Sequence, residues 1–390
     1  MNTVDIVISS DTATVRLNGR VDSANAPIVE KEIGEKTVGA ARVILDCENL
    51  EYISSAGLRI VLRLKKAFPD LSVVNVSSEV YEIFDMTGFT EMIDVQKAYR
   101  VLSVDGCEVI GQGANGKVYR IDGETIVKVY IDPDSLPDIK RERELARKAF
   151  VLGVPTAIPY DVVRVDEGYG SVFELLNAKS LAKILAEKPD KLEEVVDISV
   201  DLLKKIHSTS INDDAVPSMK QTVGGWVAFL KDYLPAADHE KLTALVAAVP
   251  HSDTLLHGDY HIKNVMMQNG EALLIDMDTL CYGDPIFEFA SVFNAYVGFS
   301  DVDHDQVTRF LGIPYETAVK FWELTLEKYF DGKSPEEIRI IEARAKLIGF
   351  TRIMRREIRR DGLNREQGRL VIENAKRKIS ELLKTVDSLT

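Results

Sequence analysis

The segment that most constrains this chain is residues 255–265, LLHGDYHIKNV, which sets polar groups inside an apolar frame. An aspartate in such a loop can take the proton of an attacking hydroxyl group, and Asp259 is the candidate. Asn264, further along the same loop, can bind a magnesium ion through its side-chain carbonyl oxygen. An HGD triplet also arises by chance, and His257 alone would be an ordinary core residue. The full spacing with Asn264 is much rarer, so it predicts a catalytic loop.

A second acidic segment follows at residues 272–278, ALLIDMD. Asp276 stands at the end of an apolar run that indicates a buried strand, where a second ligand for the same metal ion belongs. There it can join magnesium to the β- and γ-phosphates of a nucleotide. Asp278 is either a further ligand or a group behind the ligands. A solvated turn aspartate is also a fair interpretation of Asp278, but a poor one of Asp276.

A glycine-rich segment precedes both, at residues 111–118, GQGANGKV. Gly111, Gly113 and Gly116 allow a tight backbone turn whose amide hydrogens can face phosphate oxygens. Such a segment also joins plain hairpins, so alone it is a weak signal. A dinucleotide-binding site would need a helix directly after the glycines, whereas residues 118–121 indicate a strand.

Lys128, in the strand-like run IVKV, is the candidate that holds the α- and β-phosphates. Without the other motifs, Lys128 would be interpreted as a residue on the solvated side of a strand. A phosphate-binding lysine needs a carboxylate to orient it, and we expect Glu144 on the following helix, with Glu142 as the alternative. Both stand in the charged run 140–144, KRERE, which is otherwise typical of a solvated helix face.

With 390 residues, the chain is expected to form two or three domains. Residues 1–100 alternate strand and helix patterns and predict a small α/β unit. Residues 105–390 predict an α+β unit, with a strand-rich lobe at about 105–178 and a helix-rich lobe at about 179–390. The boundary is expected near residues 97–104.

Composition narrows the class of protein. The net charge of −14 argues against a general nucleic-acid binder. Cys47, Cys107 and Cys281 form no paired framework, which indicates a reducing compartment. The N-terminus lacks the pattern of a signal peptide, and no apolar run approaches the roughly 18 residues of a membrane span. We therefore expect a cytoplasmic protein without a nucleic-acid or membrane partner.

In the front unit, Ser54 and Ser55 precede Gly57 and an amphipathic helix pattern. Serines in this place ordinarily cap the helix. A phosphate there would instead meet free amides at the positive end of the helix. It would add about two negative charges and could eject an acidic partner.

From about residue 105 onward, the chain resembles the aminoglycoside phosphotransferase and choline kinase superfamily, whose signature is HGDxxxxN followed by an IDxD strand. The resemblance implies a two-lobed protein-kinase-like fold that uses ATP and Mg²⁺. It makes Asp259 the catalytic base, and Asn264 and Asp276 the magnesium ligands.

Other segments match the pattern of this superfamily or depart from it. Residues 173–176, FELL, fall where the family's hinge meets the adenine ring, through main-chain groups near Glu174 and Leu176. Residues 203–207, LKKIH, resemble the end of the family's Leu-x-x-Leu-His helix. The glycine segment is better formed than is usual in the family and nearer to that of protein kinases. The usual Asp-Leu-Ala appears as residues 288–290, EFA, which leaves the helix-capping role of that aspartate open.

Residues 1–100 resemble the STAS domain of anti-sigma factor antagonists, with further landmarks at 17–22, LNGRVD, and 86–89, MTGF. The resemblance makes Ser55 the phosphoacceptor and implies an anti-sigma-factor-like or other regulatory protein as partner. The family's Asp-Ser-Ser/Thr-Gly is here SSAG at 54–57, so the acidic residue before the serine is lost.

Three functions follow from these patterns. The first is a kinase for a sugar, an amino alcohol or an aminoglycoside, and acidic residues such as Asp284 and Glu288 would favour a cationic acceptor. The second is a regulatory protein kinase whose acceptor is a STAS serine. The third is a non-enzymatic switch, against which the retained catalytic residues argue. The short interval 276–288 favours a small acceptor.

The arginines near the C-terminus have two interpretations. The plain one is a solvated helix face that balances an acidic body. The sharper one is a face that binds an anion or a partner. The group comprises Arg352, Arg355, Arg356, Arg359 and Arg360.

Overall fold

The computed structural model of the chain describes residues 3–9, 11–113, 116–176, 178–211 and 216–390. The chain divides into two compact units, residues 1–105 with 162–169 and residues 106–161 with 170–390, and each is described by itself. Within the described ranges, no helix is long and apolar enough to cross a bilayer. Two members of the glycine segment, Ala114 and Asn115, lie outside these ranges.

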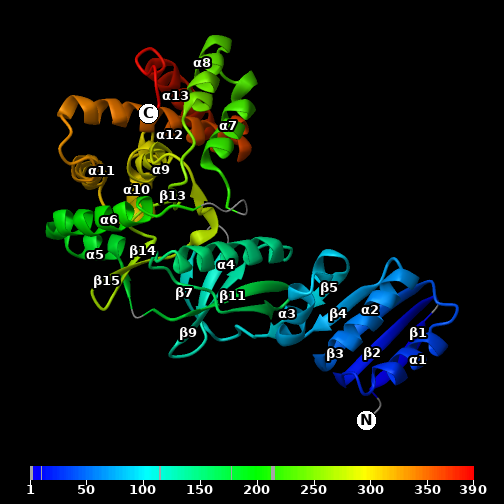
Figure 1. Cartoon of the computed structure of the whole chain (residues 1–390). Coiled ribbons are helices and arrows are strands. Elements are labelled where there is room, and N and C mark those ends of the chain that lie inside the picture. The colour runs from blue at the N-terminus through cyan, green and yellow to red at the C-terminus, as the bar shows by residue number, and fades with distance from the viewer. Residues whose placement is uncertain (1–2, 10, 114–115, 177, 212–215) are drawn as a thin grey trace. The chain divides into compact units, whose positions relative to one another are not determined.

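The first unit contains a five-stranded sheet with helices in its parallel crossovers (Figure 1). The strands stand in the order β1 (Val4–Ser9), β2 (Thr12–Val21), β3 (Arg42–Ile53), β4 (Ser72–Val76) and β5 (Asp94–Lys97). The hairpin β1–β2 is antiparallel, and the later neighbours are parallel. A parallel pair cannot be joined by a tight turn. The crossovers therefore carry α1 (Ala26–Lys36), α2 (Ser55–Ala67) and α3 (Ser78–Met86).

The prediction of a small α/β unit is confirmed, with differences in extent. Strand β3 extends well beyond the unbroken apolar run at 43–45 and ends at Ile53, because Cys47, Leu50 and Ile53 remain buried between polar neighbours. The helix α1 continues past Gly34 and stops at Lys36. In the same unit, β6 (Arg100–Val101) pairs in parallel with β10 (Asp161–Val165).

The second unit begins with an antiparallel sheet, in the order β11 (Gly168–Glu174), β9 (Thr125–Tyr130), β8 (Gly116–Arg120) and β7 (Glu108–Gln112). Gly116 opens β8, where a Cβ atom would lie 2.2 Å from the backbone oxygen of Val129. The helix α4 (Leu136–Val151) follows β9. Pro137 lies in its first turn, where its missing N–H is tolerated.

The rest of this unit is mainly helical, as predicted. Its helices are α5 (Leu181–Glu187), α6 (Leu192–His207), α7 (Met219–Phe229), α8 (Ala236–Ala248), α9 (Ile286–Tyr296), α10 (Asp305–Leu311), α11 (Tyr315–Tyr329), α12 (Pro335–Arg359) and α13 (Glu366–Leu382). Short strands interrupt them at β12 (Lys179–Ser180), β13 (Leu255–Leu256), β14 (Val265–Gln268), β15 (Glu271–Leu274) and β16 (Cys281–Tyr282). Single 3₁₀ turns occur in this unit at η2 (Pro189–Lys191), η3 (Leu230–Asp232), η4 (Met277–Thr279), η5 (Gly298–Ser300) and η6 (Gly362–Asn364), and in the first unit at η1 (Phe89–Glu91).

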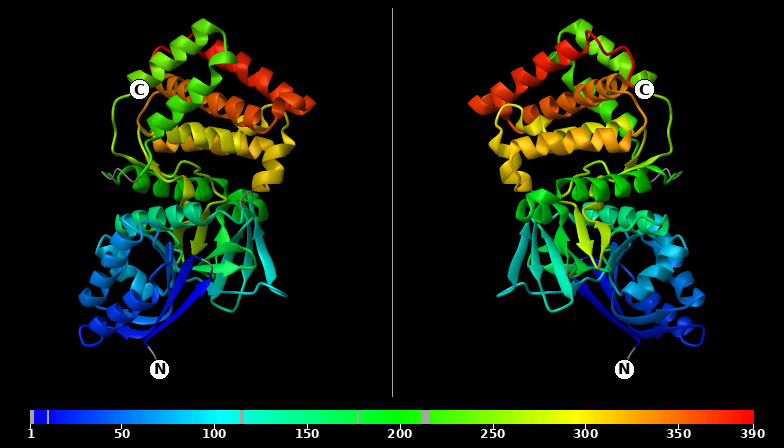
Figure 2. Two further views of the ribbon diagram at one scale, coloured as in Figure 1. Left: turned by 90° about the vertical axis from the view of Figure 1, so that its right-hand side faces the viewer. Right: turned by 90° about the vertical axis from the view of Figure 1, so that its left-hand side faces the viewer.

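The core of the helical region forms around α9, in which every residue is buried. The long helix α12 lies between α9 and α13 (Figure 2). It begins with a capping box in which the Ser334 hydroxyl and the Glu337 carboxylate satisfy each other's backbone N–H groups. This capped helix also contacts the segment that carries the catalytic motif, because the Arg352 guanidinium donates to the backbone oxygen of Gly258.

Candidate active site

A cavity of about 660 Å³ in the second unit brings the predicted residues together. The sequence-predicted residues that line it are Gly113, Gly116, Lys128, Glu142, Glu174, Leu176, Asp259, Asn264, Asp276 and Asp278. Gly111 lies in β7, beside the lining residue Ile110, and is not itself among the lining residues. Segments separated by more than one hundred residues in the sequence therefore form one site.

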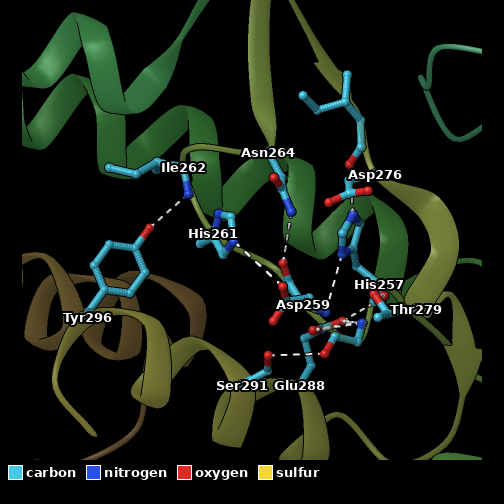
Figure 3. Close-up of polar contacts among 12 residues, drawn as sticks. His257, Asp259, His261, Ile262, Asn264, Asp276, Thr279, Glu288, Ser291 and Tyr296 are labelled. Carbon is cyan, nitrogen blue, oxygen red and sulfur yellow. Dashed lines mark hydrogen bonds and ion pairs between the residues drawn. The ribbon is translucent and has the colours of Figure 1, made fainter. Parts of the chain in front are cut away.

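The catalytic loop runs from β13 to β14 and carries Asp259 into the cavity (Figure 3). Oδ1 of Asp259 lies 3.2 Å from a guanidinium nitrogen of Arg352, and Oδ2 lies 3.7 Å from Nε2 of His261. The amide nitrogen of Asn264 donates to the backbone oxygen of Asp259 at 3.3 Å. This hydrogen bond uses the nitrogen of the Asn264 amide and not the carbonyl oxygen that a magnesium ion would take.

The charge of Asp259 is set by its neighbours. Its place in the cavity would by itself raise the pKa of the carboxyl group, since burial disfavours the charged form. The His261 hydrogen bond and the positive charge of Arg352 act in the other direction and prevail. The pKa of Asp259 therefore lies well below its ordinary value, and the group is a carboxylate at neutral pH.

The backbone of this loop is held by Glu288, in α9, which is fully buried. Its carboxylate accepts hydrogen bonds from the backbone N–H groups of His257 and Gly258, the latter at 3.1 Å. Gly258 has φ of 83°, and a Cβ atom there would lie 2.3 Å from the backbone oxygen of Thr279. Only glycine fits this turn.

The predicted acceptor role of Glu288 is thus wrong, because the side chain lies under the loop and is enclosed. Burial alone would raise the pKa of Glu288, but His207, His257 and the backbone N–H of Gly258 prevail and lower it. His207, at the end of α6, lies 3.9 Å from Glu288 and within 2.7 Å of the Tyr329 hydroxyl. Asp284 does not line the cavity either, since its carboxylate accepts from the backbone N–H of Ile286 at the start of α9.

Lys128 is fixed between two carboxylates. Its Nζ atom lies 2.9 Å from Oε1 of Glu142 and 2.9 Å from Oδ1 of Asp276. The hydroxyl of Tyr130 donates to Glu142 at 2.6 Å. Burial alone would lower the pKa of Lys128, but Glu142 and Asp276 outweigh it and raise that pKa well above its ordinary value. Lys128 is therefore a stable cation beside the glycine segment.

The partner of Lys128 is the alternative, Glu142, and not Glu144. The buried face of α4 is built from Ile139, Glu142, Ala146 and Ala149, at the spacing of successive helical turns. Glu144 lies away from this face and forms an ion pair at 3.0 Å with Arg147. The alternation of charges in KRERE could not indicate which glutamate faces inward.

Asp276 follows β15 with a left-handed backbone, φ 66° and ψ 62°. Asp278 lies behind it, where burial and the charges of Asp276 and Glu142 raise the pKa of Asp278 to about 7. Such crowding of carboxylates suits a cation. With Asn264, Asp276 offers the hard oxygen donors that magnesium prefers. In the described part of the chain, no three His, Cys, Asp or Glu side chains form a metal-binding group, so magnesium would take further ligands from phosphate and water.

The expected hinge borders the opposite wall of the cavity. Glu174 ends β11, and Leu176 follows two residues later, both lining the cavity. Between them, the backbone N–H of Leu175 donates to the backbone oxygen of Glu124 at 2.7 Å.

Sequence reasoning missed the part of the site that α12 supplies. Arg352, Arg356 and Arg360 line the cavity at four-residue spacing, which places them on one helix face. The solvated-face interpretation is wrong for Arg352, which contacts Asp259, and holds for the exposed Arg359. The spacing was a signal for a shared face, but nothing in the sequence indicated what that face meets.

In the first unit, Ser54 is the N-cap of α2, and its hydroxyl accepts from the backbone N–H groups of Ala56 at 3.2 Å and Gly57 at 3.5 Å. Ser55 is the first residue of the helix and is exposed. The two serines therefore have different surroundings, and Ser55 is the accessible one.

Comparison with known proteins agrees with these two units. A model of the phosphotransferase enzyme family (APH) matches residues 106–322, and a model of the STAS domain matches residues 3–102. BtrV of Bordetella bronchiseptica, described as an anti-sigma factor antagonist, is 39% identical over 84 residues, 20% of this chain and 72% of that protein. The anti-sigma-B factor antagonist of Bacillus subtilis is 24% identical over 96 residues, 24% of this chain and 88% of that protein.

Among solved structures, aminoglycoside phosphotransferase APH(4)-Ia matches with a TM-score of 0.51. The sequence identity is 12%, and the match covers 71% of this chain and 93% of that chain. At this identity the likeness shows the fold.

Proposed function

This chain belongs to the phosphotransferase enzyme family and carries a STAS domain before its phosphotransferase domain, and from this premise we propose that it transfers the γ-phosphoryl group of ATP to a hydroxyl group of a small molecule. The acceptors considered are a sugar, an amino alcohol and an aminoglycoside-like compound. ATP and Mg²⁺ are the cofactors of this reaction.

The observation that carries the proposal is the meeting of Lys128, Asp259, Asn264 and Asp276 in one cavity beside the glycine segment. Lys128 would hold the α- and β-phosphates under Gly113 and Gly116, while the backbone near Glu174 and Leu176 would meet the adenine ring. The nucleotide would then lie between the sheet and the catalytic loop.

Magnesium, held by Asn264 and Asp276, would neutralise charge on the phosphates. The chain itself supplies the base. Asp259 takes the proton of the acceptor hydroxyl while the hydroxyl oxygen bonds to the γ-phosphorus. The bond from that phosphorus to the β–γ bridging oxygen breaks, and ADP leaves. Because the pKa of Asp259 is low, it is a weak base, which suits proton transfer late in a loose transition state.

The proposal is tested with the full chain, γ-labelled ATP, Mg²⁺ and a panel of small alcohols. We expect label in a small molecule with the wild type, and at least a thousandfold slower transfer with Asp259→Asn. Asp201→Asn, an exposed aspartate of α6, is the matched control and should react normally. Asp259→Asn should still bind Mg²⁺–ADP. Equal transfer rates in Asp259→Asn and wild type, or no magnesium-dependent nucleotide binding, would refute the proposal.

A second function is favoured by one observation, the exposed position of Ser55 at the N-terminus of α2. In this alternative the acceptor is a STAS serine of this chain or of another protein, and the STAS domain docks an anti-sigma-factor-like or other regulatory protein. The same labelling experiment separates it: label would appear on protein, map to Ser55 and vanish in Ser55→Ala. Label confined to a small molecule would exclude it.

A further inference from the structure

The acceptor side of the cavity is bounded by cations from one helix. Arg352 and Arg356 lie on α12, and Arg360 is its C-cap residue. Lys263, from the catalytic loop, lines the same cavity, with its Nζ atom 5.0 Å from the centre of the Phe310 ring.

Arg352 is fully engaged by the catalytic loop. Besides contacting Asp259, its guanidinium donates to the backbone oxygen of Gly258 at 3.1 Å and to the Ser291 hydroxyl at 2.8 Å. It is therefore a positioning residue for Asp259 and not a free anion-binding group.

Arg356 and Arg360 differ from it. Within the described residues, neither has a carboxylate oxygen within 4 Å. Glu357, the acidic residue beside Arg356, pairs with Arg365 instead. The guanidinium of Arg356 lies 4.7 Å from the centre of the Phe299 ring, a stack that leaves the in-plane N–H groups available.

The charge on Arg356 is also unfavourable where it stands. Burial first, and then the nearby charges of Arg360 and Arg352, lower the pKa of the Arg356 guanidinium. Asp259 is close enough to act in the opposite direction, so Arg356 lies near the proposed reaction centre. A bound anion would relieve Arg356, which is partly buried and repelled by its cationic neighbours, whereas Arg360 is exposed.

We propose that the acceptor carries an anionic group, a phosphate monoester or a carboxylate, which Arg356 and Arg360 bind while its hydroxyl faces Asp259. The inference rests on the proposed function and narrows it, since a polycationic acceptor of the aminoglycoside kind would meet like charge. Two neighbouring guanidinium groups suit the paired oxygens of phosphate or carboxylate.

A plainer role for these arginines is to complement the negative end of the α12 dipole. Arg359 provides the matched control, because it lies in the last turn of α12 and is exposed like Arg360, but does not line the cavity. Arg356→Gln combined with Arg360→Gln removes the proposed pair, and Arg359→Gln removes a charge that serves only the dipole.

The first measurement is calorimetric binding of inorganic phosphate to the full chain, with AMP-PNP and Mg²⁺ at saturation so that the nucleotide subsites are filled. We expect binding to the wild type and Arg359→Gln with equal affinity, and at least tenfold weaker binding to the double variant. No phosphate binding to the wild type, or equal binding to the double variant, would overturn the inference.

The second measurement compares acceptors that share a glycerol-like hydroxyl but differ in charge: glycerol 3-phosphate, glycerate, glycerol and ethanolamine. The anionic acceptors should compete with bound phosphate in the wild type, and the neutral and cationic ones should not. Competition by ethanolamine or glycerol alone would overturn the inference and leave the proposed function standing. Failure of AMP-PNP to bind in the presence of Mg²⁺ would instead remove the proposed function and the inference with it.

Discussion

The guanidinium group of Arg352 lies 3.2 Å from Oδ1 of Asp259, a contact between residues 93 positions apart. Arg352 also binds the backbone oxygen of Gly258, so α12 holds both the side chain and the backbone of the catalytic loop. The long helix therefore contributes to the ionisation and the position of the proposed base, although it lies outside the motifs that define the site.

Arg352→Gln is expected to alter the pH dependence of the reaction. Loss of a neighbouring cation raises the pKa of a carboxyl group, so the acidic limb of the kcat/KM profile should move to higher pH by about one pH unit. The loss of rate relative to the wild type should be largest at the lowest pH at which the protein stays folded, and smallest at neutral pH. The measurement is the pH profile of phosphoryl transfer to the acceptor identified by labelling.

Arg355→Gln is the control for this profile, because Arg355 lies over the Phe229 ring, 5.9 Å from its centre, and not in the cavity. Its profile should coincide with that of the wild type. If Arg352→Gln lowers the rate equally at every pH, then Arg352 only maintains the loop structure, and its electrostatic role is excluded.

Two glutamates of α4 offer a sharper test of nucleotide binding. Glu142→Gln removes the carboxylate that holds Lys128 from the buried side, so Lys128 should be drawn toward Asp276 and bind phosphate less well. We expect affinity for Mg²⁺–ADP to fall about tenfold, which is about 1.4 kcal/mol. Glu144→Gln makes the same chemical change on the outward face and should bind as the wild type does. Calorimetry measures the affinity for Mg²⁺–ADP. Equal affinities of the two variants would contradict the assignment of Glu142 as the carboxylate that holds Lys128.

Most of the fold could be predicted from the sequence, because its periodic segments are long and the residues that end each helix or strand are easy to recognise. The alternation of strands and helices in the first unit follows from apolar runs that end at glycine or serine, such as those at Gly88 and Ser54. The lengths of the elements were harder to predict, as the strand β3 shows. Beyond Leu45, burial continues through Cys47 and Leu50 without an unbroken apolar run.

The same contrast holds for the site. Asp259, Asn264 and Asp276 were found because their spacing is local and each residue type is tied to a chemical task. Glu142 was named only as the alternative to Glu144, and Arg352 was given no role at the site, since both roles depend on which helix face meets the cavity. Long-range contacts of this kind are fixed by packing, and a single sequence carries no record of them.

Substitution of the two serines at the start of α2 should change the stability of the first unit by different amounts. Ser54→Ala removes the hydroxyl that satisfies backbone N–H groups at the helix start and should destabilise the first unit by about 1 kcal/mol. Ser55→Ala should change stability by less than about 0.5 kcal/mol, because Ser55 is exposed. Hydrogen exchange of the peptide that covers α2 measures both. Faster exchange in Ser55→Ala than in Ser54→Ala would reverse the assignment of the cap.

Glu288 is expected to contribute to stability in a pH-dependent manner. Removal of its carboxylate in Glu288→Ala leaves the backbone N–H groups of His257 and Gly258 buried without their acceptor. The cost should be about 3 kcal/mol at pH 7, as for other buried charged hydrogen-bond partners. Both tryptophans, Trp226 and Trp322, belong to the second unit, so their fluorescence during denaturation follows this unit alone.

The pH dependence follows from the lowered pKa of Glu288 in the folded chain. A carboxyl group of this kind stabilises the fold above its ordinary pKa of 4.5, and the contribution is lost as the pH falls through the lower, folded value. The difference in unfolding free energy between wild type and Glu288→Ala should therefore be constant from pH 6 to 8 and shrink below pH 4.5. Glu316→Gln, an exposed glutamate of α11, should show neither effect. If this difference in unfolding free energy instead grows on acidification, Glu288 is protonated in the folded state. A charged Glu288 carboxylate would then not be what holds the catalytic loop.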